Sequence, residues 1–492
     1  MQESRTPIAR SLVVTILFCA VLLTCLKIVS YGYLPADDAL RHAAKAVSGK
    51  SWQEIIVMRP EMRTDRHHGW HAFLTAIYRL TDCEPETLVV VAVVVLALVF
   101  LVAPIPWLAR PEVWPLAFVY AGIAASPPVM GRIFLGRPFI FTMTVLLTLC
   151  LLWPRLRGPR LPLGTLSLLV GLVSVSTWVN GVPHLYVLPL LAFALAREWT
   201  VVRRFTIVLA LGSIVGASLT GSPVRFIWEG LLLSSRAFAD SPLQNMLVVE
   251  FQAFGGDASF LLAILVVLLW RRVRGDWNSA DLFRDPVFLL MCLGWALGFS
   301  VMRFWTDWGL VAALVWLARE FDQVAERRLS AATNLRLVVA LAGGLLLYLN
   351  LSSDLQGRWT KSLTKEYLSQ ADPVQKEWLP DPGGIVYSDA TQVFYDTFYR
   401  NPDGQWRYVM AFEPTLMPED DLKILRRIQW SSSAFSAFLP WVEKMKPADR
   451  LIVLNNGGPP RLSQLEWASF IPDVWVGRLP RSRQLTDQSS KR

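Results

Sequence analysis

The chain has 492 residues, of which 53% are hydrophobic and only 18% are charged, with 21 tryptophans and a formal net charge of +9. Such a composition excludes an ordinary soluble domain, and apolar runs of about 17–25 residues, the length that crosses a bilayer as a helix, recur along the chain. The positive charge does not indicate nucleic-acid binding, because the arginines lie in short loops between apolar runs. The sequence therefore predicts an α-helical polytopic membrane protein that has the lipid bilayer, and no nucleic acid, as a partner.

The first apolar run covers residues 11–31 and follows Arg5 and Arg10. It is too long for the core of a signal peptide and has no small-x-small cleavage site, so we expect a retained anchor with a cytoplasmic N-terminus. Together with this run, about eleven membrane-spanning helices are predicted. The later ones are expected at residues 87–107, 113–128, 138–153, 162–178, 183–196, 205–221, 258–270, 286–302, 307–319 and 334–352.

The arginines mark one side of the membrane. They cluster in every second loop, at Arg110; Arg155, Arg157 and Arg160; Arg197, Arg203 and Arg204; Arg271, Arg272 and Arg274; and Arg319, Arg327 and Arg328. The positive-inside rule places these loops in the cytoplasm with the N-terminus. An odd number of spans then leaves the C-terminal region outside, in a multi-pass protein of the inner (plasma) membrane.

The composition changes near Ser353. Residues 353–492 are polar and rich in Pro, Gly and Asn, with strand-like runs at residues 384–387 and 451–454. About 140 residues are enough for one small soluble domain. We therefore expect a transmembrane module over residues 1–352 and an extracytoplasmic α/β domain over residues 353–492.

The first outer loop, residues 32–86, holds four of the five histidines and a pair of acids, Asp37 and Asp38. Two short helices are expected in it, over residues 39–47 and about 70–80. On the first helix, Asp38 would face Arg41 and His42 at i+3 and i+4. Ionisable groups at the mouth of an apolar bundle are costly unless they bind or react with something. The alternative interpretation is that the two acids only cap the helix.

The segment Asp38-Ala39-Leu40-Arg41-His42 resembles the Asp-Glu-x-Arg-Tyr start of the first outer loop in aminoarabinose transferases and their relatives. These enzymes belong to the GT-C superfamily of polytopic membrane glycosyltransferases. The layout is also similar: an acid directly after the first helix, a long first outer loop and a terminal outer domain. This sequence departs from the family in having Ala39 in place of the second acid, and it has no Asp-x-Asp or Trp-Trp-Asp motif.

The resemblance implies a GT-C-like helical bundle that transfers a sugar, with inversion, from a polyprenyl-phosphate donor to a glycan, lipid or protein acceptor. On this match Asp38 takes the place of the catalytic acid. It would accept the proton of the acceptor hydroxyl, while cations stabilise the phosphate leaving group. Asp37, Arg41 and His42 would then bind the donor or the acceptor.

Three arginines lie on the expected outer side, where the topology rule disfavours them: Arg132, Arg137 and Arg303. Their forked guanidinium groups suit a phosphate or pyrophosphate. The alternative is a structural ion pair with a nearby acid such as Asp307.

The remaining candidates are histidines. His67 and His71 would share a helix face, although Gly69 is expected to interrupt that helix, and they are predicted to contact the donor phosphate or a Mg²⁺ or Mn²⁺ ion. Ordinary hydrogen-bonded loop histidines are the alternative. His184 follows the turn at Asn180-Gly181, which would either line the acceptor cavity or simply join two helices.

A second class of function also fits a chain with a dozen helices and a large outer region: a non-catalytic transport role, or a polymerase or ligase, in polysaccharide export. A transporter, however, is expected to have polar, Gly- or Pro-broken helices in matching halves, and the sequence has no such symmetry.

The topology can be tested with a fusion after Arg492. A reporter enzyme that is active only outside the cytoplasm is expected to be active there, because the arginine pattern leaves the tail outside. A reporter that is active only in the cytoplasm, fused at the same residue, serves as the control and should be silent. The reverse result would contradict the odd number of spans.

Overall fold

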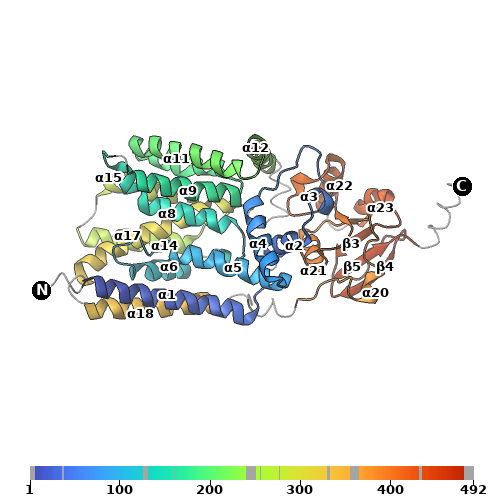
Figure 1. Ribbon diagram of the computed structural model, residues 1–492, viewed down its shortest axis with the longest axis horizontal. Helices are drawn as coiled ribbons and strands as arrows, with labels where there is room; N and C mark the ends of the chain where they lie inside the picture. The colour runs from blue at the N-terminus through green and yellow to red at the C-terminus, as the bar shows by residue number, and fades with distance from the viewer. Residues whose placement is uncertain are drawn as a thin grey trace.

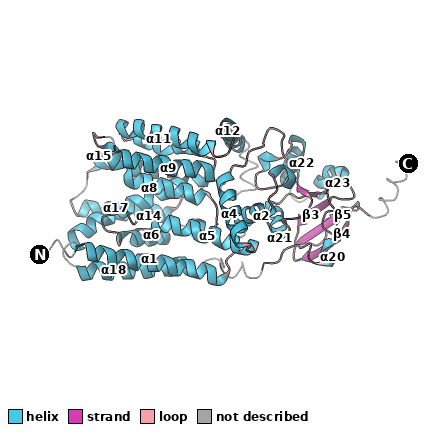
Figure 2. Ribbon diagram, viewed as in Figure 1, coloured by secondary structure: helices cyan, strands magenta, loops and turns pink. Residues whose placement is uncertain are grey.

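The computed structural model describes residues 6–35, 38–125, 131–160, 162–239, 251–254, 256–275, 278–329, 333–354, 359, 365–431 and 435–480. It consists of a long helical bundle, followed at one end by a small domain that contains the strands (Figures 1 and 2). Helix α1 starts at the end of the bundle far from the strands and runs toward them (Figure 1).

Each apolar run predicted from the sequence contains a helix. These are α1 (Thr6–Tyr31), α5 (Pro85–Val102), α6 (Val113–Ala124), α8 (Phe139–Arg157), α9 (Leu163–Val179), α10 (Val187–Leu195), α11 (Trp199–Ser218), α14 (Ala258–Val273), α16 (Pro286–Gly298), α17 (Leu310–Leu329) and α18 (Thr333–Ser352). Among the described residues, five helices are long and apolar enough to cross a membrane: α1, α5, α8, α11 and α18. This finding agrees with a helical membrane protein, and the number of eleven membrane-spanning helices stays a prediction.

The first outer loop forms three helices between the bundle and the small domain. They are α2 (Asp38–Ser48), α3 (Trp52–Ile55) and α4 (His68–Thr81). The two predicted helices are thus present, but Gly69 does not interrupt the second one. It lies in the first turn of α4, where the Trp178 ring packs against it. A Cβ at Gly69 would be 2.4 Å from a ring atom, so only glycine fits at this position.

Helix α12 (Pro223–Ala239) was not predicted. Its charged residues, Arg225, Glu229 and Arg236, hide its apolar side from a search for continuous apolar runs. Glu229 is buried and accepts hydrogen bonds from the backbone N–H groups of Arg63 (3.0 Å) and Thr64 (2.8 Å). The helix therefore holds the outer loop in place just before the predicted histidine cluster.

The small domain is mixed α/β. Its sheet has the order β2-β1-β3-β5-β4, with strands β1 (Ile385–Tyr387), β2 (Arg407–Tyr408), β3 (Arg450–Leu454), β4 (Glu466–Ile471) and β5 (Val474–Arg478). Strands β2, β1 and β3 are parallel, and β5 and β4 join antiparallel. Helices α20 (Pro373–Lys376), α21 (Thr391–Arg400), α22 (Glu419–Trp430) and α23 (Leu439–Lys444) pack around it. Both strand-like runs seen in the sequence lie in this sheet, as β1 and β3.

The outer loop and the small domain are joined through backbone and helix contacts. Ile56 forms a parallel bridge with Tyr408 at the edge strand β2, and the N–H of Val57 donates to the Tyr408 carbonyl (2.8 Å). Helix α2 packs against α4, α5 and α21. The start of α2, at Asp38, therefore lies where the bundle meets the small domain.

One close helix approach positions charged residues at this junction. Helix α16 packs against a π-helical turn, η4 (Phe304–Gly309), through Gly294 and Gly309. A Cβ at Gly294 would be 2.4 Å from the Cα of Gly309, which is shorter than any real contact. Only glycine lets the two backbones approach this closely, and the η4 turn carries Asp307.

We expect Gly294→Ala to lower the thermal unfolding temperature, because the added methyl group must push α16 and η4 apart at a cost of about 1–3 kcal/mol. The measurement is thermal unfolding of the purified protein in nanodiscs. Gly164→Ala in α9 is the matched control: nothing lies within 4 Å of its Cβ position, and alanine favours a helix. Equal unfolding temperatures for the two variants would contradict the packing argument.

Candidate active site

A cavity of about 410 Å³ lies between the ends of the bundle helices and the small domain. This volume is within the range of small-molecule sites. One part of its wall is charged or titratable: Asp38, Arg41, Arg66, His67, Arg137, Arg303, Asp307 and Glu413. Another part is apolar: Phe139, Leu233, Ala237, Phe251, Val301, Phe304 and Trp308. Four arginines thus face three acids beside an apolar surface.

Asp38 is surrounded by donors. Its Oδ1 atom accepts from Arg41 Nε (2.7 Å) and from the Tyr395 hydroxyl (3.0 Å), and its Oδ2 atom lies 3.6 Å from Arg137 Nε. Burial alone would raise the pKa of this carboxyl, but the guanidinium groups of Arg41 and Arg137 hold the pKa well below its ordinary value. Asp38 is therefore a firmly ionised anchor for two arginines in the resting site.

Arg41 is almost completely buried, with a side chain that is 3% exposed. Its guanidinium carbon lies 3.9 Å from the centre of the Phe412 ring, and Asp38 is its ion-pair partner. A guanidinium group shielded from water by an aromatic face is strongly attracted to it and to a carboxylate. Arg41 therefore connects α2 of the outer loop to the small domain.

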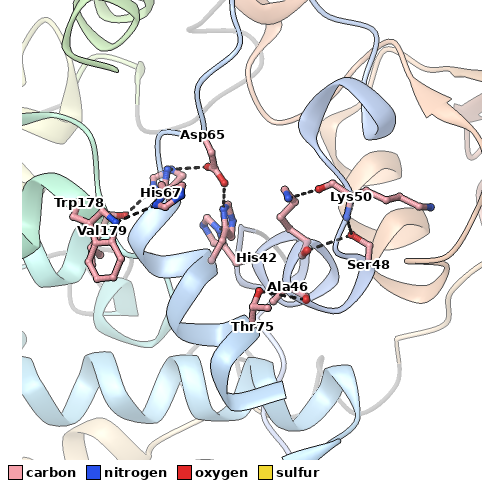
Figure 3. A network of polar contacts seen from close by, with 12 residues as sticks. His42, Ala46, Ser48, Lys50, Asp65, His67, Thr75, Trp178 and Val179 are labelled. Carbon is pink, nitrogen blue, oxygen red and sulfur yellow. Dashed lines mark hydrogen bonds and ion pairs between the residues drawn. The ribbon is translucent and has the colours of Figure 1, made fainter. Parts of the chain in front are cut away.

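His42 and His71 form a hydrogen-bonded chain that ends at Asp65, and His67 packs beside it; Figure 3 labels Asp65, His42 and His67. His71 Nδ1 is 2.5 Å from Asp65 Oδ2, and His71 Nε2 is 2.8 Å from His42 Nδ1. The ring of His67 packs edge-on against that of His42, with centroids 4.9 Å apart. The predicted histidines His42, His67 and His71 thus lie next to one another, and of these three only His67 lines the cavity.

The direction of these hydrogen bonds follows from charge. Burial alone would raise the pKa of Asp65, but His71 keeps it well below its ordinary value, so Asp65 is ionised and only accepts. Burial lowers the pKa of His71 and His42, so both rings are neutral. His71 therefore donates from Nδ1 and accepts at Nε2 from His42. The buried Nε2 of His42 keeps a lone pair with no hydrogen-bond partner among the described residues.

Two predicted arginines meet at Asp307. Arg132 Nη2 is 2.7 Å from Asp307 Oδ1, and Arg303 Nε is 3.3 Å from Oδ2. Asp307 and Arg303 line the cavity, whereas Arg132 is buried behind Asp307. The structure thus places both arginines in an ion pair with Asp307, as in the alternative interpretation, and of the two only Arg303 also lines the cavity.

The other predicted residues are placed as follows. Arg137 lines the cavity next to Asp38. His184 Nε2 lies 3.0 Å from the Ser234 hydroxyl, and Ser234, not His184, is part of the cavity wall. Asp37 lies outside the described residues.

A metal site is not formed by the described side chains: no group of three or more His, Cys, Asp or Glu residues among them is arranged to hold an ion. His42 and His71 use their facing nitrogens for each other, and the His67 Nδ1 atom is 3.3 Å from the Val179 carbonyl. The expected Mg²⁺ or Mn²⁺ contact of these histidines therefore has no support in the geometry, and no step below is derived through a metal.

Sequence analysis missed the contribution of the small domain. The small domain contributes three side chains to the cavity wall: Tyr395 on α21, and Phe412 and Glu413 in the segment after β2. All three lie more than 350 positions beyond Asp38 in the sequence. Nothing in their local sequence indicates such a role. Arg66 was also missed, although it directly precedes His67, and it pairs with Glu413 at 3.9 Å.

Comparison with known protein families and with curated protein sequences gives no match for this chain. The site is therefore interpreted from its own geometry.

The pair of Asp38 and Arg41 makes a prediction about stability. Asp38→Asn is expected to destabilise the protein by about 3 kcal/mol, because it leaves the buried Arg41 without its anionic partner. Adding Arg41→Met should restore most of the lost unfolding temperature, since it removes the stranded charge. Asp420→Asn is the control, because Asp420 is 82% exposed and forms only a surface pair with Lys423. An Asp38→Asn variant that melts with the parent would contradict this view of the junction.

Proposed function

We propose that this protein is a membrane glycosyltransferase that moves a sugar from a polyprenyl-phosphate donor to an acceptor hydroxyl on the outer face of the membrane. The observation that carries the proposal is the cavity at the junction, in which arginines and carboxylates stand next to an apolar wall. A lipid phosphate needs both features: cations for the phosphate and an apolar surface for the first part of the polyprenyl chain.

The arginines supply the phosphate site. Arg66, Arg137 and Arg303 line the cavity, and each has a carboxylate within 4 Å: Glu413, Asp38 and Asp307 respectively. The Arg137 and Arg303 contacts, at 3.6 Å and 3.3 Å, are longer than the 2.7 Å bond between Arg41 and Asp38. A phosphate can therefore take over the outer donors, while Arg41 remains with Asp38.

The apolar wall supplies the site for the lipid. Phe251, Phe304 and Trp308 line the cavity beside Arg303, and the guanidinium carbon of Arg303 lies 5.8 Å from the centre of the Phe251 ring. Leu233 and Ala237 of α12 extend this surface. The phosphate of a lipid held here would lie at the ends of the bundle helices, where a membrane-embedded chain leaves the bilayer.

The reaction needs positioned charges and a proton acceptor. The acceptor oxygen attacks the anomeric carbon, the bond from this carbon to the phosphate oxygen breaks, and the arginines stabilise the charge on the leaving phosphate. Direct displacement inverts the anomeric carbon. Of the three cavity carboxylates, Asp307 is held by Arg132 and Arg303, which leaves Asp38 and Glu413 to take the hydroxyl proton.

Undecaprenyl phosphate tests the proposal, since it is the product shared by donors of this class whatever their sugar. We expect it to bind the purified protein in nanodiscs, measured by calorimetry, and Arg137→Lys to weaken binding about tenfold, roughly 1.4 kcal/mol. Lysine keeps the charge but loses the planar fork that fits phosphate oxygens.

Two controls accompany this measurement. Arg400→Lys changes an exposed arginine outside the cavity, paired with Glu86 at 3.4 Å, and should bind like the parent. Undecaprenol, which lacks the phosphate, should bind without any dependence on Arg137. Absence of phosphate-dependent binding would sink the proposal. Binding without release of undecaprenyl phosphate from any of its hexose or pentose derivatives would favour the transport role.

A further inference from the structure

We infer that Glu413, and not Asp38, is the carboxylate that accepts the proton in this cavity, and that Asp38 serves as the ion-pair anchor of Arg41 and Arg137. The inference rests on the proposed function and adds to it the identity of the base. It assigns a catalytic residue to the small domain, so that the site is complete only when this domain sits on the outer loop.

The two carboxylates differ in how many donors already contact them. Asp38 receives a short bond from Arg41 (2.7 Å) and another from Tyr395 (3.0 Å), and it faces Arg137 as well. A carboxylate oxygen has two lone pairs, and both on Asp38 Oδ1 accept hydrogen bonds, while Oδ2 faces the Arg137 guanidinium group at 3.6 Å. Protonating Asp38 would cancel the charge that holds the buried Arg41. Glu413, in contrast, is paired only loosely, with Arg66 Nη1 at 3.9 Å from its Oε1 atom.

The backbone segment that carries Glu413 is held by hydrogen bonds to the outer loop. On one side of it, the Val57 N–H donates to the Tyr408 carbonyl (2.8 Å), and on the other the Arg59 N–H donates to the Leu416 carbonyl (2.9 Å). The two bonds fix the backbone segment that carries Glu413 to the outer loop. A general base must be held within hydrogen-bond reach of its proton, and a segment pinned at both ends satisfies this requirement.

The pKa values of the two acids are shifted in opposite directions by their surroundings. Burial raises the pKa of Glu413 above its ordinary value, and Arg66 and Arg303 offset only part of this rise, while Asp38 adds to it. The pKa of Asp38 is shifted the other way. Two acids of one cavity whose pKa values are pushed apart mark the one that exchanges a proton and the one that stays charged.

The proposed transfer forms one bond to the anomeric carbon and breaks another. The acceptor oxygen forms its bond to the anomeric carbon, and the electron pair of the carbon–oxygen bond to phosphate leaves with the phosphate. The hydroxyl proton moves to the Glu413 carboxylate, which becomes a neutral acid and later releases the proton to water. Asp38 keeps its negative charge throughout, so Arg41 stays in place.

The test measures proton uptake when undecaprenyl phosphate binds, by calorimetry in two buffers of different ionisation enthalpy between about pH 5 and pH 8. Undecaprenyl phosphate reproduces the product complex, in which Glu413 holds the transferred proton. The negative product phosphate should raise the pKa of Glu413 further, so the parent protein takes up as much as about one proton per lipid beyond what the phosphate itself exchanges. Glu413→Gln should bind at least as tightly, because a like charge is gone, and should lose this uptake.

Glu419→Gln is the matched control. Glu419 lies six residues further along the chain, is half exposed and pairs with Arg59 at 2.8 Å, outside the cavity. It should show the proton uptake of the parent. Equal uptake by the parent and Glu413→Gln would overturn the inference. So would failure of Glu413→Gln to bind, because Glu413 would then only hold Arg66. A parent that binds no lipid phosphate would instead refute the proposed function, and the inference with it.

Discussion

The buried guanidinium of Arg41 is the interaction on which the arrangement of the site depends. It is bound by Asp38 of its own helix and covered by Phe412 of the small domain. A buried charge without such partners would cost several kcal/mol, so the helix, the loop after β2 and the Asp38 carboxylate must be present together. The Tyr395 hydroxyl adds a second link between the same two parts of the protein. The cavity is the space that remains around this junction.

The division of roles between two carboxylates follows from that constraint. Because Arg41 needs an anion at all times, Asp38 is kept ionised by its surroundings, and its affinity for protons is low. Glu413 has no buried ion-pair partner of this kind among the described residues, and burial increases its affinity for protons. A site built around a permanently paired acid therefore needs a second acid for proton transfer, and the small domain contributes one to the same cavity.

Much of this organisation could be predicted from the sequence, because it is local. Apolar runs predicted the helices, short strand-like runs predicted two of the strands, and the spacing from Asp38 to Arg41 correctly placed both on one helix face. Helix α12 was missed, because a helix that lies across a surface mixes charged and apolar residues. Tyr395 and Glu413 were missed for a different reason: their roles arise only when the small domain packs on the outer loop, and no local pattern records that contact.

The arginines of the cavity also explain how a site rich in charge stays stable without a ligand. Each of the three that face the proposed phosphate lies within 4 Å of a carboxylate, at 3.3 Å for Arg303, 3.6 Å for Arg137 and 3.9 Å for Arg66. Exchanging such loose contacts for charge-assisted bonds to a phosphate costs little, whereas the donors are already in position. The carboxylate released most readily in this exchange is Glu413, the loosest partner. Phosphate binding at Arg66 would therefore free Glu413 at the moment when a proton has to be accepted.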